Sequence, residues 1–129
     1  PRHLNLRSWL YRILPSVVAA DYEPYTKVKS LVFAKQQAPN PYRWSPLSPP
    51  SQPQDFVDSL FLMAGNNVCN AFIYQCNKSM QNHYFSDSDG ELLLVPYSGK
   101  LKIRTEFGLL ILKPGKIAVI PRGVKFKVE

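Results

Sequence analysis

The sequence contains few of the residues that form cross-links or bind soft metals. Its 129 residues include only two cysteines and two histidines, and Cys69 and Cys76 do not form a CxxC pair. This excludes a disulfide-rich scaffold and leaves no zinc or redox motif. Such sparse cysteines are typical of a reducing compartment, so we expect a cytoplasmic protein with both thiols free and buried in a sheet.

Glycine-rich loops and long apolar runs are also missing. With six glycines, no GxGxxG or GxxxxGK motif occurs, which leaves no phosphate-binding loop. Apolar runs such as Leu92–Val95 and Leu109–Leu112 have the length of a strand, far below the roughly 18–20 residues of a membrane span. We therefore expect no membrane partner. The chain opens at Pro1 without a signal peptide and stops at Glu129 inside an apparent strand, which predicts a piece truncated at both ends.

Acidic residues are the minority charge. Nine Asp and Glu stand against 16 Lys and Arg, a formal net charge of +7. Two acidic residues and eight basic ones fall within residues 100–129; the basic ones are Lys100, Lys102, Arg104, Lys113, Lys116, Arg122, Lys125 and Lys127. Lys102 and Arg104 alternate with Leu101 and Ile103, which predicts a strand with one basic, solvated face. No nucleic-acid motif accompanies this charge, so we expect no nucleic-acid partner, and a basic nucleic-acid-binding domain is the alternative.

Proline is abundant: 12 residues of 129, about twice the usual share of about 5%. Residues 38–50 hold many of them and cannot form a helix, because proline lacks the amide donor. We expect residues 1–50 to be extended, with a surface strap pinned by Tyr42 and Trp44. A ligand segment for an SH3-type partner is the alternative.

One strand is expected within this extended region. Trp9, Tyr11 and Ile13 recur at a spacing of two, and Pro15 ends the run. We expect these side chains to form a packing surface.

The pattern of residues 51–129 predicts a β-rich domain. Phe56, Leu60 and Met63 lie at near-helical spacing before Gly65, which predicts a short helix over residues 55–65 with a glycine C-cap. Short strands separated by Gly and Pro turns follow, which favours an antiparallel sandwich or jelly roll. The expected strands are Asn70–Cys76, Leu92–Val95, Lys100–Phe107, Leu109–Leu112, Ile117–Ile120 and Val124–Val128.

The turn spacing is similar to that of cupin jelly rolls. Gly115, Pro121, Gly123 and Phe126 follow the second cupin motif, and Gly99 stands at the glycine that closes the first. Metal-binding cupins have a histidine ligand where this chain has Phe126, which cannot bind a metal. The His-x-His pair of the first motif is absent as well. The resemblance implies a metal-free cupin-like sandwich preceded by the extended proline-rich segment.

The remaining polar residues do not assemble a site. An iron facial triad needs two histidines and a carboxylate, and nothing in the spacing brings His3 and His83 together. Asp87 and Asp89 begin like a calcium loop, but the later ligands are missing, so an Asp-Gly turn is favoured. Glu91 adds no further ligand. Neither cysteine has a glycine-rich elbow or an orienting group that would make His83 a catalytic base. We predict no catalytic, cofactor-binding or metal-binding residue in this chain.

Several blocks in order resemble the homogentisate 1,2-dioxygenase family. Ser59, where the family usually has glycine, and residues 66–68 depart from it, and residues 17–40 have no clear match. The matching blocks are Arg7–Ser16, Arg43–Pro46, Asp55–Leu60, Met63–Asn66, Cys76–Met80, Ser88–Pro96, Thr105–Gly108 and Ile120–Phe126.

The resemblance implies an Fe(II) dioxygenase of tyrosine and phenylalanine catabolism, which converts homogentisate and O2 to maleylacetoacetate. It implies iron held by two histidines and a glutamate of a C-terminal catalytic domain that this chain lacks. The expected partners are that domain and identical subunits in a dimer of trimers. This N-terminal part would then be structural and inactive alone. A standalone metal-free cupin binding module is the alternative.

Overall fold

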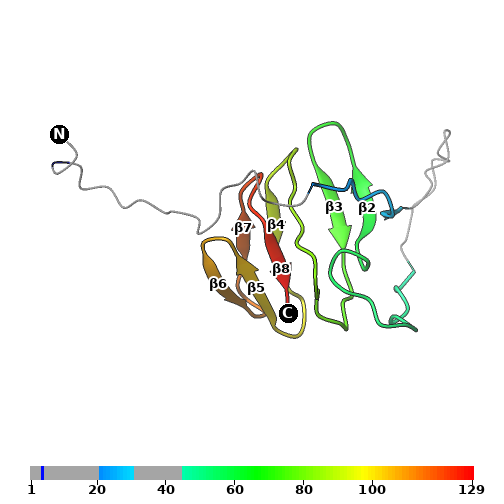
Figure 1. Ribbon diagram of the computed structural model, residues 1–129. Helices are drawn as coiled ribbons and strands as arrows, with labels where there is room; N and C mark the ends of the chain where they lie inside the picture. Colours follow the sequence, from blue (N-terminus) through cyan, green and yellow to red (C-terminus); the bar gives the residue numbers. More distant parts are fainter. Residues whose placement is uncertain (1–3, 5–20, 31–44) are drawn as a thin grey trace.

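The computed structural model describes residue 4, residues 21–30 and residues 45–129. The predicted strand that carries Trp9, Tyr11 and Ile13 lies outside these ranges, as do Tyr42 and Trp44. The described part is mainly β, as predicted, and its longer strand pairs are antiparallel (Figure 1). Within it, no helix is long and apolar enough to cross a bilayer.

The strands lie close to the positions that alternation and turn residues predict. Each of the six expected strands is present and most are shorter at their ends, where glycine and proline turns begin. The described residues form β1 (Lys29–Ser30), β2 (Phe61–Gly65), β3 (Asn70–Ile73), β4 (Leu92–Leu94), β5 (Leu101–Thr105), β6 (Gly108–Leu112), β7 (Ala118–Ile120) and β8 (Phe126–Val128).

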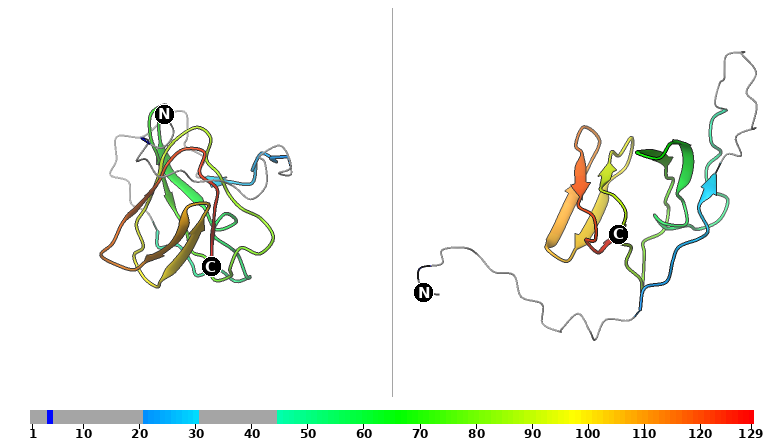
Figure 2. Two further views of the ribbon diagram at one scale, coloured as in Figure 1. Left: turned by 60° about the vertical axis from the view of Figure 1, so that its left-hand side comes forward. Right: turned by 90° about the horizontal axis from the view of Figure 1, so that it is seen from above.

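These strands form three small sheets. β1 pairs in parallel with β2, which pairs antiparallel with β3; β4 pairs with β7; and β5 lies between β6 and β8. The sheet with β2 and β3 stands to one side of the other two, in the front view and from above (Figures 1 and 2). The pairing of β1 brings Lys29 and Ser30 of the extended segment onto this sheet.

The core lies between the β4–β7 pair and the β6–β5–β8 sheet. Leu94 and Ile120 from the first pack in one buried cluster with Ile103 and Phe126 from the second. The predicted alternation along β5 is confirmed, because Leu101 and Ile103 are buried whereas Lys102 and Arg104 are exposed.

Two glycine turns set the ends of β6, β7 and β8. Gly115 has φ +83° in the turn that Lys116 N closes by donating to Lys113 O (3.0 Å). Gly123 has φ +79° in the turn that Val124 N closes onto Pro121 O (3.1 Å). An L side chain at either glycine would be strained, so the motif spacing read from the sequence marks real turn positions.

The helix predicted over residues 55–65 is wrong. The chain makes one turn, in which Ser59 N donates to Asp55 O (3.0 Å), and then enters β2. Phe56 and Leu60 are buried from that single turn. Gly65 is not a helix cap but pairs with Asn70 in the β2–β3 hairpin, where a Cβ would collide with the Asn70 side chain. The near-helical spacing therefore reflects one turn followed by a strand.

Candidate functional site

A buried carboxylate paired with a histidine is the most organised polar feature of the described chain. Asp55 Oδ1 accepts from Val57 N and Asp58 N, both at 3.1 Å, and so caps the turn that starts the domain. Asp55 Oδ2 lies 3.0 Å from His83 Nε2. The Asp55 side chain is 5% exposed and that of His83 is 54% exposed. The carboxylate thus joins two loops that are 28 positions apart.

Three groups near this pair have raised pKa values. Burial raises the pKa of the Cys76 thiol, and the nearby Asp55 charge raises it further. Burial also raises the pKa of Tyr74, whose hydroxyl is buried without a hydrogen-bond partner among the described residues. For Tyr25, burial and then the Asp58 charge raise the pKa, and its hydroxyl donates to Asp58 Oδ1 (3.3 Å). A raised thiol pKa opposes nucleophilic use of Cys76.

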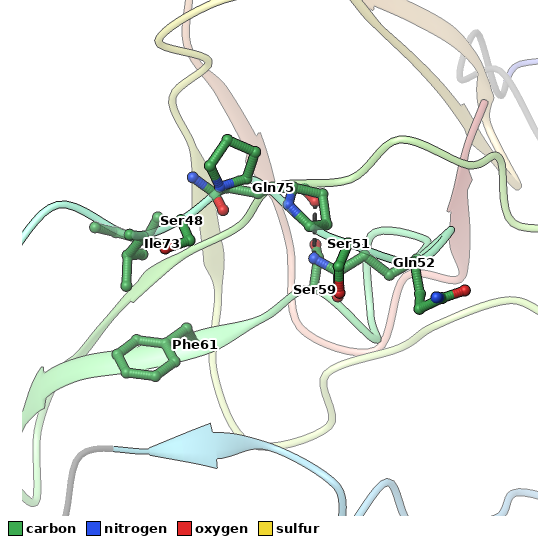
Figure 3. A pocket seen from close by; sticks show the side chains of 11 residues that line it. Ser48, Ser51, Gln52, Ser59, Phe61, Ile73 and Gln75 are labelled. Carbon is green, nitrogen blue, oxygen red and sulfur yellow. Dashed lines mark hydrogen bonds between the residues drawn. The ribbon is translucent and has the colours of Figure 1, made fainter.

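A shallow groove of about 420 Å³ lies beside this turn. The proline-rich stretch 47–54 forms one wall, and Phe61 and Ile73 of β2 and β3 form the other (Figure 3). Gln54 Nε2 donates to Gln75 O (3.0 Å) and fastens the two walls together. The lining contains no acidic, basic, histidine or cysteine side chain. The described end of the strap therefore docks onto its own sheet and offers no acid, base or charged nucleophile.

Phe126, the residue that the sequence aligns with a cupin metal ligand, lies in the hydrophobic core. Phe126 is fully buried in β8 and meets Phe56 and Phe85 edge to face, with ring centroids 5.9 Å and 5.8 Å apart. Its backbone exchanges two hydrogen bonds with Phe85. The side chain at this position thus stabilises the sandwich.

The acidic residues of the loop before β4 form a turn. Asp87 Oδ1 accepts from Asp89 N (2.9 Å) and Gly90 N (3.1 Å), which is the Asp-Gly turn favoured by the sequence. Asp89 and Glu91 are exposed. The Asp87 carboxylate is therefore engaged by its own backbone.

The described residues do not supply an iron site. Among residue 4 and residues 21–30 and 45–129, no three His, Cys, Asp or Glu side chains gather closely enough to hold a metal ion. His83 is the one histidine in these ranges, and a facial triad needs two with a carboxylate.

The prediction that both cysteines are buried in a sheet is wrong. Both are free thiols, but Cys69 is exposed at the turn between β2 and β3, and Cys76 is half-buried beyond the end of β3. Asn66 explains the exposed turn, because its Oδ1 accepts from Val68 N (2.8 Å) and Cys69 N (2.9 Å).

Several basic side chains of the C-terminal stripe are engaged by the chain itself. Arg104 Nε and Lys127 Nζ both contact Glu129 Oε1, at 3.1 Å and 3.0 Å. Lys125 Nζ lies 5.6 Å from the Tyr22 ring centroid, and Lys127 Nζ 5.7 Å from that of Tyr84. These contacts support the interpretation of the stripe as a solvated outer face.

The Glu129 pair predicts a pH-dependent contribution to stability. Hydrogen bonds from Arg104 and then Lys127 lower the pKa of Glu129 from 4.5 to about 2. Because the folded state binds fewer protons, this contribution is complete above about pH 4.5 and is lost as the pH falls toward 2. We expect Glu129→Gln to lower the thermal midpoint of the full-length protein at pH 7. The difference in thermal midpoint between this variant and wild type should become smaller below pH 4.5, as measured by calorimetric scans at a series of pH values.

Glu91→Gln provides the control for this series, because Glu91 is also an exposed glutamate. Its midpoint should follow that of wild type throughout. If the difference in thermal midpoint between Glu129→Gln and wild type stayed constant from pH 7 to pH 3, this would contradict the ion-pair explanation.

Comparison with known proteins identifies the sequence family. The sequence model of the family described as homogentisate 1,2-dioxygenase N-terminal matches residues 1–129. Proteins named homogentisate 1,2-dioxygenase from Legionella pneumophila strains Philadelphia 1, Lens and Corby are each 55% identical over 130 residues. These matches cover 100% of this chain and 31% of each relative, so the chain spans about a third of their length. The chain belongs to the homogentisate 1,2-dioxygenase N-terminal family.

Proposed function

We propose that this chain is the N-terminal segment of an Fe(II)-dependent homogentisate 1,2-dioxygenase of tyrosine and phenylalanine catabolism in the cytoplasm. The observation that carries the proposal is the 55% identity to proteins of that name over the whole chain. The reaction adds both atoms of O2 to homogentisate and yields maleylacetoacetate, so no further reductant is required.

Within that enzyme, the proposed role of this segment is structural. Its described part has a histidine engaged by a buried aspartate, a shielded thiol and a phenylalanine at the cupin ligand position. These side chains make contacts within the fold, which supports a structural role. Accordingly, the proposal assigns no catalytic, cofactor-binding or metal-binding residue to this chain and places the iron ligands in the C-terminal catalytic domain.

The proposed organisation has two parts. Residues 1–50 form an extended proline-rich arm, and residues 51–129 form a metal-free cupin-like sandwich. Two contacts attach the arm to the sandwich: β1 pairs in parallel with β2, and residues 47–50 line the groove beside Phe61 and Ile73. The partners in this proposal are the catalytic domain of the same polypeptide and identical subunits in a dimer of trimers.

The activity is tested with the full-length protein supplied with Fe(II). We expect O2 uptake equal to the amount of homogentisate consumed, with maleylacetoacetate as the product, measured by an oxygen electrode and chromatography. A matched sample treated with an iron chelator should consume neither substrate. A full-length protein that binds Fe(II) but leaves homogentisate unchanged would overturn the proposal.

A further inference from the structure

The β4–β7 pair is apolar on both of its faces. Its inner face contributes Leu94 and Ile120 to the core, where each is 3% exposed. Leu93 and Val119 lie opposite each other in the register and point the other way. Val95 directly follows β4, and Ile117 directly precedes β7. Each lies two residues along the chain from Leu93 or Val119, so both continue the same outer row.

These four side chains form the outer face of the β4–β7 pair. Leu93, Val95, Ile117 and Val119 are between 54% and 66% exposed. No charged residue interrupts the row. An antiparallel sheet with one solvated face normally alternates apolar and polar residues, whereas a strand buried on both faces has a continuous apolar run such as Leu92–Val95. The sequence of this pair is that of a sheet covered on both sides.

The β6–β5–β8 sheet, the other layer of the sandwich, has a different outer face. On β5, the residues that alternate with buried Leu101 and Ile103 are Lys102 and Arg104, and both are exposed. Opposite them on β6 lie Ile111 and Leu109, which are 43% and 49% exposed, so the outer face of this layer mixes basic and apolar side chains. The β4–β7 outer face has no basic side chain among its four residues, and an uninterrupted apolar row of this kind is typical of a surface that other polypeptide covers.

We propose that the outer face of the β4–β7 pair is an intramolecular docking surface, covered by polypeptide of the same subunit from outside this N-terminal segment. This inference rests on the proposed function, because the relatives have 69% of their length beyond the 31% that this chain matches. That length provides ample polypeptide to cover the surface.

A second copy of the chain is the less suitable occupant. A stable interface between separate proteins uses roughly 20–30 residues on each side, and association also costs translational and rotational freedom. Four apolar side chains fall well short of such an interface. Polypeptide that is already tethered loses little of this freedom, so a small apolar surface is enough to dock it.

Site-specific thiol labelling tests whether the face is covered. In the full-length protein, Val119→Cys is compared with Val68→Cys, the same substitution at a residue that is 93% exposed in the β2–β3 turn. Alkylation is followed by mass spectrometry of the peptides, with and without denaturant. We expect position 119 to react at least about tenfold more slowly than position 68 in the native protein, and equally fast in denaturant. Equal native rates would overturn the inference.

The occupant is identified by the molar mass of a second variant. Val119→Thr keeps the β-branched shape and places a hydroxyl on the docking surface. We expect light scattering to give the wild-type molar mass and calorimetry to give a lower thermal midpoint. A lower molar mass would show that another copy covers the face and would overturn the inference. Neither readout requires activity, so failure of the proposed ring cleavage would be recognised separately.

Discussion

Replacing Phe126 with alanine is expected to destabilise the N-terminal segment of the full-length protein by about 3–5 kcal/mol, the range for removing a buried aromatic side chain. Phe126 is fully buried and contacts Phe56 and Phe85 edge to face. Alanine would leave a cavity where the loop before β4 meets β8, because Phe85 and Phe126 are also joined through their backbones. The loss of stability should therefore affect both the loop before β4 and β8.

Native-state hydrogen exchange of the amides in β5 and β8 measures this effect locally, which is necessary because the relatives are about three times as long as this segment. Phe107→Ala is the matched control. Phe107 is 63% exposed in the turn between β5 and β6, so the same change there should cost less than about 0.5 kcal/mol. Similar losses of protection in the two variants would refute the assignment of Phe126 to the core.

Replacing Asp55 with alanine is expected to cost about 2–3 kcal/mol, because hydrogen bonds to a buried charged group contribute about 1.5–3 kcal/mol. The variant loses the two acceptor contacts to Val57 N and Asp58 N that cap the turn, together with the contact to His83. His83→Ala removes only the last of these and should cost less, since its side chain is half exposed. The same exchange measurement, on the amides of residues 57–60, checks both variants.

Asp58→Ala is the control for this position. Asp58 lies in the same turn and is exposed, and its carboxylate accepts one longer contact from Tyr25 (3.3 Å). We expect a loss below about 0.5 kcal/mol. If Asp55→Ala were no more damaging than Asp58→Ala, the carboxylate–histidine pair would not be a structural element of this fold.

The C-terminal half of the fold could be predicted from local sequence because two independent signals agree there. Side chains alternate along β5, and glycines with positive φ, such as Gly115 and Gly123, stand at the strand ends. The helix prediction for residues 55–65 was wrong because one capped turn followed by a strand produces the same short apolar spacing as a helix. A sequence of this length does not distinguish the two without the pairing partner, which here is β3.

The pairing of Asp55 with His83 could not be predicted from the sequence for a different reason. An aspartate before an apolar turn is a recognisable cap signal, and Asp55 does cap. Its second contact is with His83, 28 positions away, and no local pattern announces it. Exposure of Cys69 likewise depends on the Asn66 turn and not on alternation. The contacts that define this region are tertiary, so they became visible only in the structure.

The central claim of the proposed function is that this segment supports an iron enzyme without binding its iron. The most direct test is the iron content of the full-length protein with both histidines of this segment replaced, His3→Gln together with His83→Gln. Glutamine at position 83 retains an N–H donor for Asp55. We expect the double variant to hold as much iron per chain as wild type, measured by mass spectrometry of the metal, and to consume O2 with homogentisate at the wild-type rate. Loss of iron from the folded double variant would contradict it.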